Sequence, residues 1–90
     1  MSEDPRPIRV YDPVRFDDQW ISFAARDSAG PLTIRIGRLA WENLQADPPD
    51  DYSADDRRDY ALGMIEARAA WRPVITTPEG RLLTIPAYDA

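Results

Sequence analysis

The acidic residues of this chain gather in one short stretch, and their spacing is the strongest hint of chemistry in the sequence. Residues 47–59 hold six aspartates against two arginines. Spaced carboxylates can bind a hard cation, or they can imitate phosphates and occupy a basic partner. A calcium loop needs a glycine at its sixth position and a terminal glutamate. This stretch has two prolines and no glycine, so we predict no metal site and keep phosphate mimicry open. The six are Asp47, Asp50, Asp51, Asp55, Asp56 and Asp59.

Most of the side chains that usually carry catalysis are absent. There is no cysteine, which excludes disulfides, thiolate zinc sites and thiol nucleophiles. There is no histidine, which removes the commonest metal ligand and general base. All eleven basic residues are arginine, which excludes Schiff-base chemistry. We therefore predict that the protein is not an enzyme and that it has no catalytic residues and no cofactor.

Charge and hydropathy narrow the range of partners. The net charge of −5 argues against nonspecific nucleic-acid binding, which needs a basic surface. No apolar run approaches the roughly 18 residues that span a bilayer, and the acidic, proline-bearing N-terminus does not resemble a signal peptide. We expect a small cytoplasmic protein of bacterial type that has neither a membrane nor a nucleic acid as its partner.

The longest expected element is a helix over residues 53–71. Ser53 is a good N-cap, because its hydroxyl can accept a free backbone N–H of the first turn, and Pro73 marks the stop. At about 100° per residue, one apolar stripe forms. We expect this stripe to be buried against a sheet; it consists of Tyr60, Met64, Ala67 and Trp71.

Two strand pairs flank the helices. Residues 32–36 alternate cleanly, with Leu32 and Ile34 inward and Thr33 and Arg35 outward, as in a sheet covered on one side. The expected elements are an edge strand at 8–11 ended by an Asp12-Pro13 turn, strands at 20–25 and 32–36, a short helix at 38–46, an extended diproline linker, the long helix, and strands at 74–77 and 81–85. We predict the α+β class: an antiparallel sheet of two hairpins in ββααββ order, with two helices packed on one face.

The domain organisation follows from the same pattern. Residues 1–7 are polar and contain two prolines, so we predict a flexible N-terminal tail. Residues 8–90 are expected to form a single α+β domain.

The layout resembles a family of small bacterial proteins described only as domain of unknown function 1488. The resemblance rests on Tyr11-Asp12, the strand ending at Phe23, the alternating residues 32–36 and the short helix 39–44. Further matches are Glu66, Arg68 and Trp71 on the long helix, and residues 83–89 as the closing strand. The resemblance implies an α+β fold of this size and assigns no activity.

The residue types favour a binding role. Tryptophan, tyrosine and arginine anchor interfaces, and three tryptophans occur in ninety residues. An open edge strand can pair with a partner strand or with a second copy. We predict a protein-binding or adaptor module, or a homodimer, without catalysis. The predicted partner-binding residues are Trp20, Trp41, Arg35, Arg68, Arg72, Asp50, Asp51 and Asp55.

The main alternative is an acidic inhibitor in which residues 47–59 imitate phosphates and engage a nucleic-acid-binding protein. Two further interpretations have less support. One is an enzyme built on carboxylates. The other is a single-strand reader in which Arg26, Arg35, Arg68 and Arg72 contact the backbone while Trp20 or Trp41 stacks bases.

Overall fold

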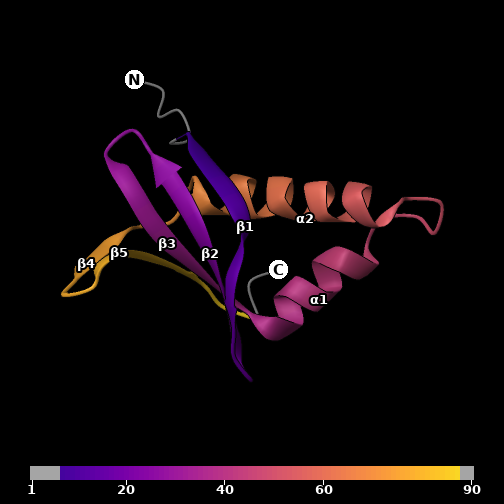
Figure 1. Ribbon diagram of the computed structural model, residues 1–90, viewed down its shortest axis with the longest axis horizontal. Helices are drawn as coiled ribbons and strands as arrows, with labels where there is room; N and C mark the ends of the chain where they lie inside the picture. The colour runs from indigo at the N-terminus through magenta and orange to yellow at the C-terminus, as the bar shows by residue number, and fades with distance from the viewer. Residues whose placement is uncertain (1–6, 88–90) are drawn as a thin grey trace.

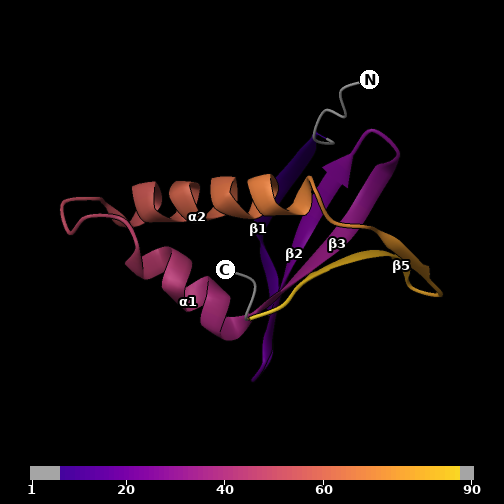
Figure 2. The ribbon, with the colours of Figure 1, turned by 180° about the vertical axis from the view of Figure 1, so that it is seen from behind.

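The protein is a five-stranded sheet with two helices, seen from two sides in Figures 1 and 2. A computed structural model describes residues 7–87. The expected flexible tail lies outside the described residues except for Pro7. In chain order the elements are β1 (Ile8–Phe16), β2 (Trp20–Asp27), β3 (Gly30–Gly37), α1 (Arg38–Ala46), α2 (Ala54–Ala69), β4 (Ile75–Thr77) and β5 (Gly80–Ile85).

The strand order is β1-β2-β3-β5-β4, and it corrects the expected topology. Both predicted hairpins form, because β2 pairs antiparallel with β3 and β4 with β5. The prediction of an antiparallel sheet in ββααββ order is wrong, since β5 runs parallel to β3 and a fifth strand, β1, pairs with β2. A tight turn cannot join parallel neighbours. The chain between β3 and β5 therefore contains both helices and β4.

Strand β1 is longer than expected. The predicted turn at Asp12-Pro13 is wrong, because the strand continues to Phe16. Register shifts between Val10 and Pro13, and between Pro13 and Arg15, each place an extra residue against β2. These are β-bulges, which bend a strand without ending it.

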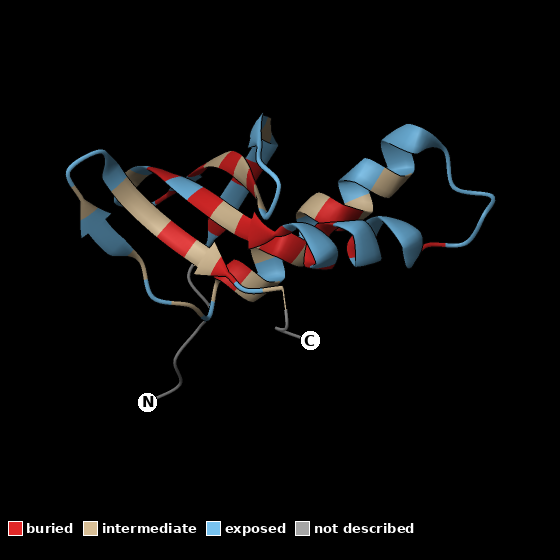
Figure 3. Cartoon of the chain, turned by 90° about the horizontal axis from the view of Figure 1, so that it is seen from below, coloured by how far each residue is buried: buried red, intermediate tan, exposed pale blue. Residues whose placement is uncertain are grey.

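One hydrophobic core fills the space between the sheet and the helices (Figure 3). The alternation predicted for β2 and β3 is confirmed, since Phe23, Ile34 and Ile36 are fully buried. Trp41 of α1 packs edge-to-face on Phe23, with 5.0 Å between the ring centroids. Such a pair contributes stability beyond its buried area, so this contact ties α1 to the centre of the sheet.

Helix α2 begins as the sequence predicts but buries a different face. The Ser53 hydroxyl accepts the Asp56 N–H at 3.1 Å. The buried residues are Ala61, Ile65 and Ala69. The predicted core stripe, Tyr60, Met64, Ala67 and Trp71, is therefore wrong: Ala67 is exposed, and Trp71, 66% exposed, lies beyond the helix end. Small side chains on the true inner face let the helix approach the sheet closely.

The first half of α2 and the loop before it project past the β1 edge of the sheet (Figures 1 and 3). Residues 49–56 are all exposed there. The aspartate-rich stretch is thus held away from the core.

The loop from α1 to α2 is folded back by one arginine. Arg57 donates to the carbonyl oxygens of Gln45 and Pro49, both at 2.9 Å. Pro48 is buried beside it. The expected linker is solvated, since every residue from 47 to 53 except Pro48 is exposed. The expectation that it is extended is wrong, because Arg57 supplies donors that gather the carbonyls of both prolines into a turn.

An ion pair fixes the end of the sheet opposite α1. Arg81 donates to both carboxylate oxygens of Asp27, at 2.8 and 2.7 Å. The Asp27 side chain is only 1% exposed, and its carboxylate also accepts the Ala29 N–H in the β2–β3 turn. Gly30 and Gly80, at φ +124° and +129°, supply the turn conformation that other residues rarely adopt. The pair thereby joins the first hairpin to β5.

Candidate binding face of the sheet

The sheet face that points away from the helices carries a continuous row of polar side chains. Direct strand partners place Arg15 of β1 opposite Ser22, Ser22 opposite Arg35, and Arg35 opposite Thr84 of β5. Residues directly opposite one another share a face of the sheet. The row therefore crosses four strands.

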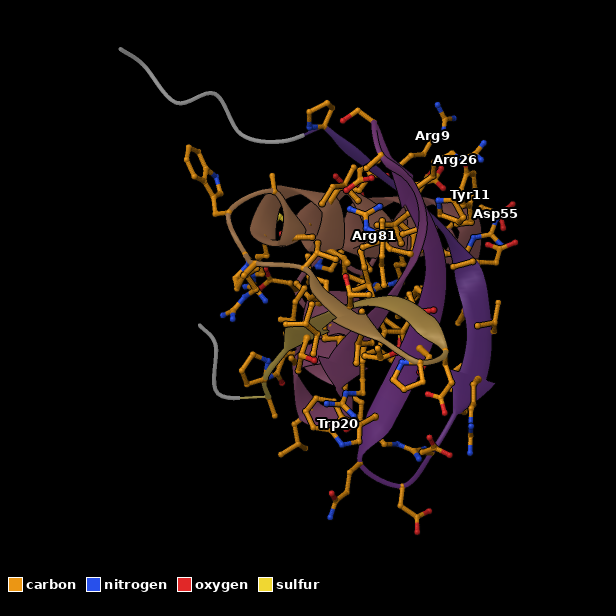
Figure 4. All side chains as sticks on the ribbon, turned by 90° about the vertical axis from the view of Figure 1, so that its left-hand side faces the viewer. Arg9, Tyr11, Trp20, Arg26, Asp55 and Arg81 are labelled. Carbon is orange, nitrogen blue, oxygen red and sulfur yellow. The ribbon has the colours of Figure 1, made fainter. Side chains whose placement is uncertain are left out.

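A second row lies further along the same face. Arg9 of β1 is the direct partner of Arg26 on β2. Figure 4 shows these two arginines at one end of the sheet and Trp20 at the other. Between the rows the face carries small side chains, Ala24 opposite Thr33. Leu82 of β5 is the next partner of Thr33, so the paired positions between the two rows are uncharged.

Arginine is the only charged residue type at paired positions of this face within the described sheet. The chain as a whole carries a net charge of −5. Its acidic residues lie largely elsewhere, many of them on the projecting loop and the first half of α2. This separation of charge gives the open face a positive potential that can steer an acidic partner.

Each row shares a hollow with two carboxylates. Arg9 and Arg26 line a hollow of about 750 Å³ with Asp59 and Glu66 of α2. The hollow beside Arg35 is lined by Asp17 and Glu79. Among residues 7–87, none of these four carboxylates lies within ion-pair distance of Arg9, Arg26 or Arg35.

Arg35 is held by an aromatic ring instead. Its guanidinium carbon lies 4.4 Å from the centroid of the Trp20 ring, a cation–π arrangement. One terminal nitrogen donates to the Thr84 hydroxyl at a long 3.4 Å. The Nε group is buried and donates to no described residue. An unsatisfied buried donor costs free energy. The terminal nitrogens make only the long bond to Thr84 among the described residues, so they keep donors for a further acceptor.

A hollow of about 350 Å³ opens over this row, beneath the β4–β5 turn. Arg15, Ser22, Thr33 and Arg35 line it from the sheet. Cations and hydroxyl groups are suited to holding an anion. The rim also carries Asp17, which pairs with Arg15 at 3.3 Å, and Glu79 of the turn.

Both edges of the sheet are poorly suited to adding a strand. On β1, the Val10 N–H is taken by the Glu66 carboxylate at 2.8 Å, and Pro13 has no N–H to offer. Bulges and prolines are the usual means of blocking an edge. On the other side, β4 is only three residues long. The face, not the edge, is therefore the surface to consider.

The predicted partner-binding residues lie in separate places. Trp20 and Arg35 lie together on the open face. Trp41 is 6% exposed and buried in the core, so it is not available to a partner. Arg68 lies in the last turn of α2 and Arg72 just after it, on the helix that covers the opposite face. The aspartates Asp50, Asp51 and Asp55 are exposed on the projecting loop and the start of α2.

Sequence reasoning missed Arg9 and Arg15 as members of the face. Arg26 was considered only as a contact for single-stranded nucleic acid. The signal available for Arg9 and Arg26 was strand alternation, which places Arg9 between the buried Ile8 and Val10 and Arg26 in phase with Ser22 and Ala24. For Arg15 the bulges in β1 break the period, so alternation alone could not have found it.

The aspartate-rich stretch is partly neutralised by its own arginines. Asp50 lies 3.8 Å from Arg57, and Asp55 lies 3.9 Å from Arg58. The Tyr60 hydroxyl donates to Asp47 at 2.9 Å, and this hydrogen bond raises the pKa of Tyr60 above its ordinary value. Among residues 7–87 no group of three carboxylates is placed to hold a metal ion. None of these contacts favours phosphate mimicry, which stays a prediction.

Within the described part of the chain, no helix has the length and apolar character needed to cross a membrane. Comparison with protein-family models, curated proteins and solved structures gives no match. The resemblance to domain of unknown function 1488 therefore stays a prediction from spacing and residue type.

Proposed function

We propose that this protein is a non-catalytic binding module that receives an acidic, extended segment of a protein partner on the open face of its sheet. The observation that carries the proposal is the distribution of charge. Arg9, Arg15, Arg26 and Arg35 share a face of a chain that is acidic overall. Among residues 7–87, the only carboxylate within ion-pair distance of these four is Asp17, which makes an exposed contact with Arg15. Charge complementarity of this kind sets specificity and association rate.

The spacing of the rows describes the partner further. Arg26 and Ser22 mark the two rows on β2, four residues apart along the strand. At about 3.3 Å per residue this is roughly 13 Å. An extended segment that lies along the strands would reach both rows when its carboxylates are also about four residues apart. The small side chains of Ala24 and Thr33 leave room for its backbone.

A protein segment fits this face better than a single-stranded nucleic acid. Proteins that bind single strands stack the bases on exposed aromatic rings. Here the Arg35 guanidinium already lies over the Trp20 ring, so that ring is not free to stack on a base. The net charge of −5 also opposes a polyanion as long as a nucleic acid. Assembly of two copies through strand edges has little support, because both edges are short or blocked.

A peptide titration tests the proposal. The probe is a fluorescently labelled extended peptide with two glutamates four residues apart, followed by anisotropy at low ionic strength. We expect saturable binding that weakens as salt shortens the Debye length below about 10 Å. Arg26→Glu should weaken binding about tenfold or more, because it sets like charges together.

The matched control is Arg58→Glu, which changes the net charge equally but lies on the projecting half of α2. This variant should bind the peptide nearly as well as the parent protein. If both variants lost the same amount of peptide affinity, the net charge of the protein would explain the binding, and the proposal would be refuted. Tighter binding of a single-stranded oligonucleotide of matched charge would reassign the face to nucleic acid.

A further inference from the structure

Arg35 is the arginine of the open face whose side chain carries a buried donor without an acceptor among the described residues. Its guanidinium is half-buried, its Nε finds no acceptor, and its one hydrogen bond to Thr84 is long. Partly buried charges normally find a counter-charge. Elsewhere this chain provides one, as the Arg81 pair with Asp27 at 2.7 Å shows. The missing counter-charge at Arg35 points to an anion supplied from outside.

The groups around Arg35 define what that anion must look like. Arg15 brings a second guanidinium to the same hollow, and its contact with Asp17 is an exposed pair that gives way at little cost. Ser22 and Thr33 add two hydroxyl donors. A carboxylate offers two oxygens and one charge. A phosphate monoester offers three terminal oxygens and close to two charges, which matches two guanidiniums and two hydroxyls better.

We propose that the hollow formed by Arg15, Ser22, Thr33 and Arg35 binds a phosphate monoester, carried on a phosphorylated side chain of the partner segment. This inference rests on the proposed function and identifies the group that anchors the segment. The phosphate takes the unused donors of Arg35 and thereby draws the guanidinium partly off the Trp20 ring. The indole emission of Trp20 then reports binding directly.

The acidic group on the rim supplies an internal check. Glu79 lines the hollow from the β4–β5 turn, where its charge repels a bound phosphate. Glu79→Gln should therefore tighten phosphate binding, whereas the same substitution at Glu42, on α1 and outside this hollow, should not.

The experiment titrates three probes into the full chain by calorimetry and by tryptophan fluorescence. The probes are a phosphoserine peptide, the same peptide with glutamate in place of phosphoserine, and inorganic phosphate. We expect the phosphoserine peptide to bind about tenfold or more tightly than the glutamate peptide. The reason is that glutamate cannot make all the charge-assisted hydrogen bonds that phosphate makes, and the loss of one such bond weakens binding by about this factor. Detectable binding of inorganic phosphate would show that the phosphate group is recognised without the peptide.

Two variants separate this inference from the proposed function. Arg35→Met keeps the stem of the side chain, and we expect it to abolish the preference for phosphate. Arg9→Met should weaken both peptides about equally and leave that preference intact. Trp20→Phe should remove the fluorescence change while calorimetric binding persists. Thermal melts of each variant confirm folding.

Equal affinity for phosphoserine and glutamate peptides, unaffected by Arg35→Met, would overturn the phosphate site and leave the acidic-segment module standing. Failure of both peptides to bind would overturn both. Binding of inorganic phosphate without either peptide would retain the anion site and refute its link to a protein segment.

Discussion

The two faces of the sheet are made from alternate residues of the same strands, yet they differ in nearly every property. On β2 and β3, Phe23 and Ile34 face the helices and are fully buried. Their neighbours Ser22 and Arg35 face away from the helices, where only the β4–β5 turn approaches them. The covered face excludes water because its apolar side chains pack against the helices. The open face leaves hydroxyl and guanidinium groups accessible to water. The residues that stabilise the fold and those of the proposed binding face are therefore separated by a single position along each strand.

This separation predicts that the two faces respond differently to truncation, and the largest effect is expected on the covered side. Ile65 of α2 is fully buried in the core. Ile65→Ala should lower the free energy of unfolding by about 2–5 kcal/mol, through lost apolar burial and the cavity left behind. Urea denaturation followed by circular dichroism measures it.

The control for that experiment is Thr33→Ala on the open face, which should change stability by less than about 0.5 kcal/mol, as exposed substitutions usually do. A comparable loss in the two variants would mean that the open face also contributes to folding.

An intermediate loss of stability is expected at the ion pair between Asp27 and Arg81, which lies at the edge of the hydrophobic core. Asp27→Asn keeps the shape of the side chain but removes the charge that Arg81 binds through both terminal nitrogens. We expect a lower melting temperature, because breaking a buried pair leaves its partner uncompensated. The drop should exceed that of Asp12→Asn, which disrupts only the exposed contact with Arg58. Equal melting temperatures for the two variants would show that the Asp27–Arg81 pair contributes no more to stability than the exposed contact between Asp12 and Arg58.

The smallest effect on stability is expected in the projecting loop and the first half of α2, which belong to neither face of the sheet. The hydrogen bond to Asp47 raises the pKa of Tyr60 in the folded state. The folded chain therefore keeps the phenol proton after the unfolded chain has lost it. The resulting stabilisation is complete below the ordinary tyrosine pKa of about 10 and is lost as pH rises through the raised value.

Phenolate absorbance during an alkaline titration measures that pKa, and Tyr60→Phe assigns the signal. Asp47→Ala should return the Tyr60 pKa toward its ordinary value. An unchanged titration in Asp47→Ala would show that the hydrogen bond does not form in solution.

Local features of the fold could be predicted because nearby residues determine them. Ser53 caps α2 through a contact three residues away, and alternation alone identifies the buried side of β2 and β3. The turn at Gly80 follows from its own backbone freedom. Each of these inferences uses a window of a few residues.

The features that sequence reasoning missed depend on distant partners. Nothing in the alternation of residues 81–85 says that β5 joins β3 in parallel. The buried face of α2, Ala61, Ile65 and Ala69, lies beside the stripe that helical periodicity marked out, because periodicity alone does not say which side of the helix meets the sheet. The open face was found only in part, since two bulges move Arg15 into line with Ser22 and Arg35. The surroundings of the Arg35 Nε could not be predicted either, because they are formed by residues of three strands: Trp20 on β2, Arg35 itself on β3 and Thr84 on β5.

The parallel pairing of β3 with β5 has a consequence for the order in which the molecule assembles. Arg35 and Thr84 are neighbours across these strands although 49 positions separate them in the chain. Closing so long a loop costs conformational entropy before any contact compensates it. The meander of the first three strands needs only short connections, so it is expected to form early. A newly made chain would then complete the proposed binding face in one late step, when β5 enters and the β4–β5 turn comes to lie over Arg35.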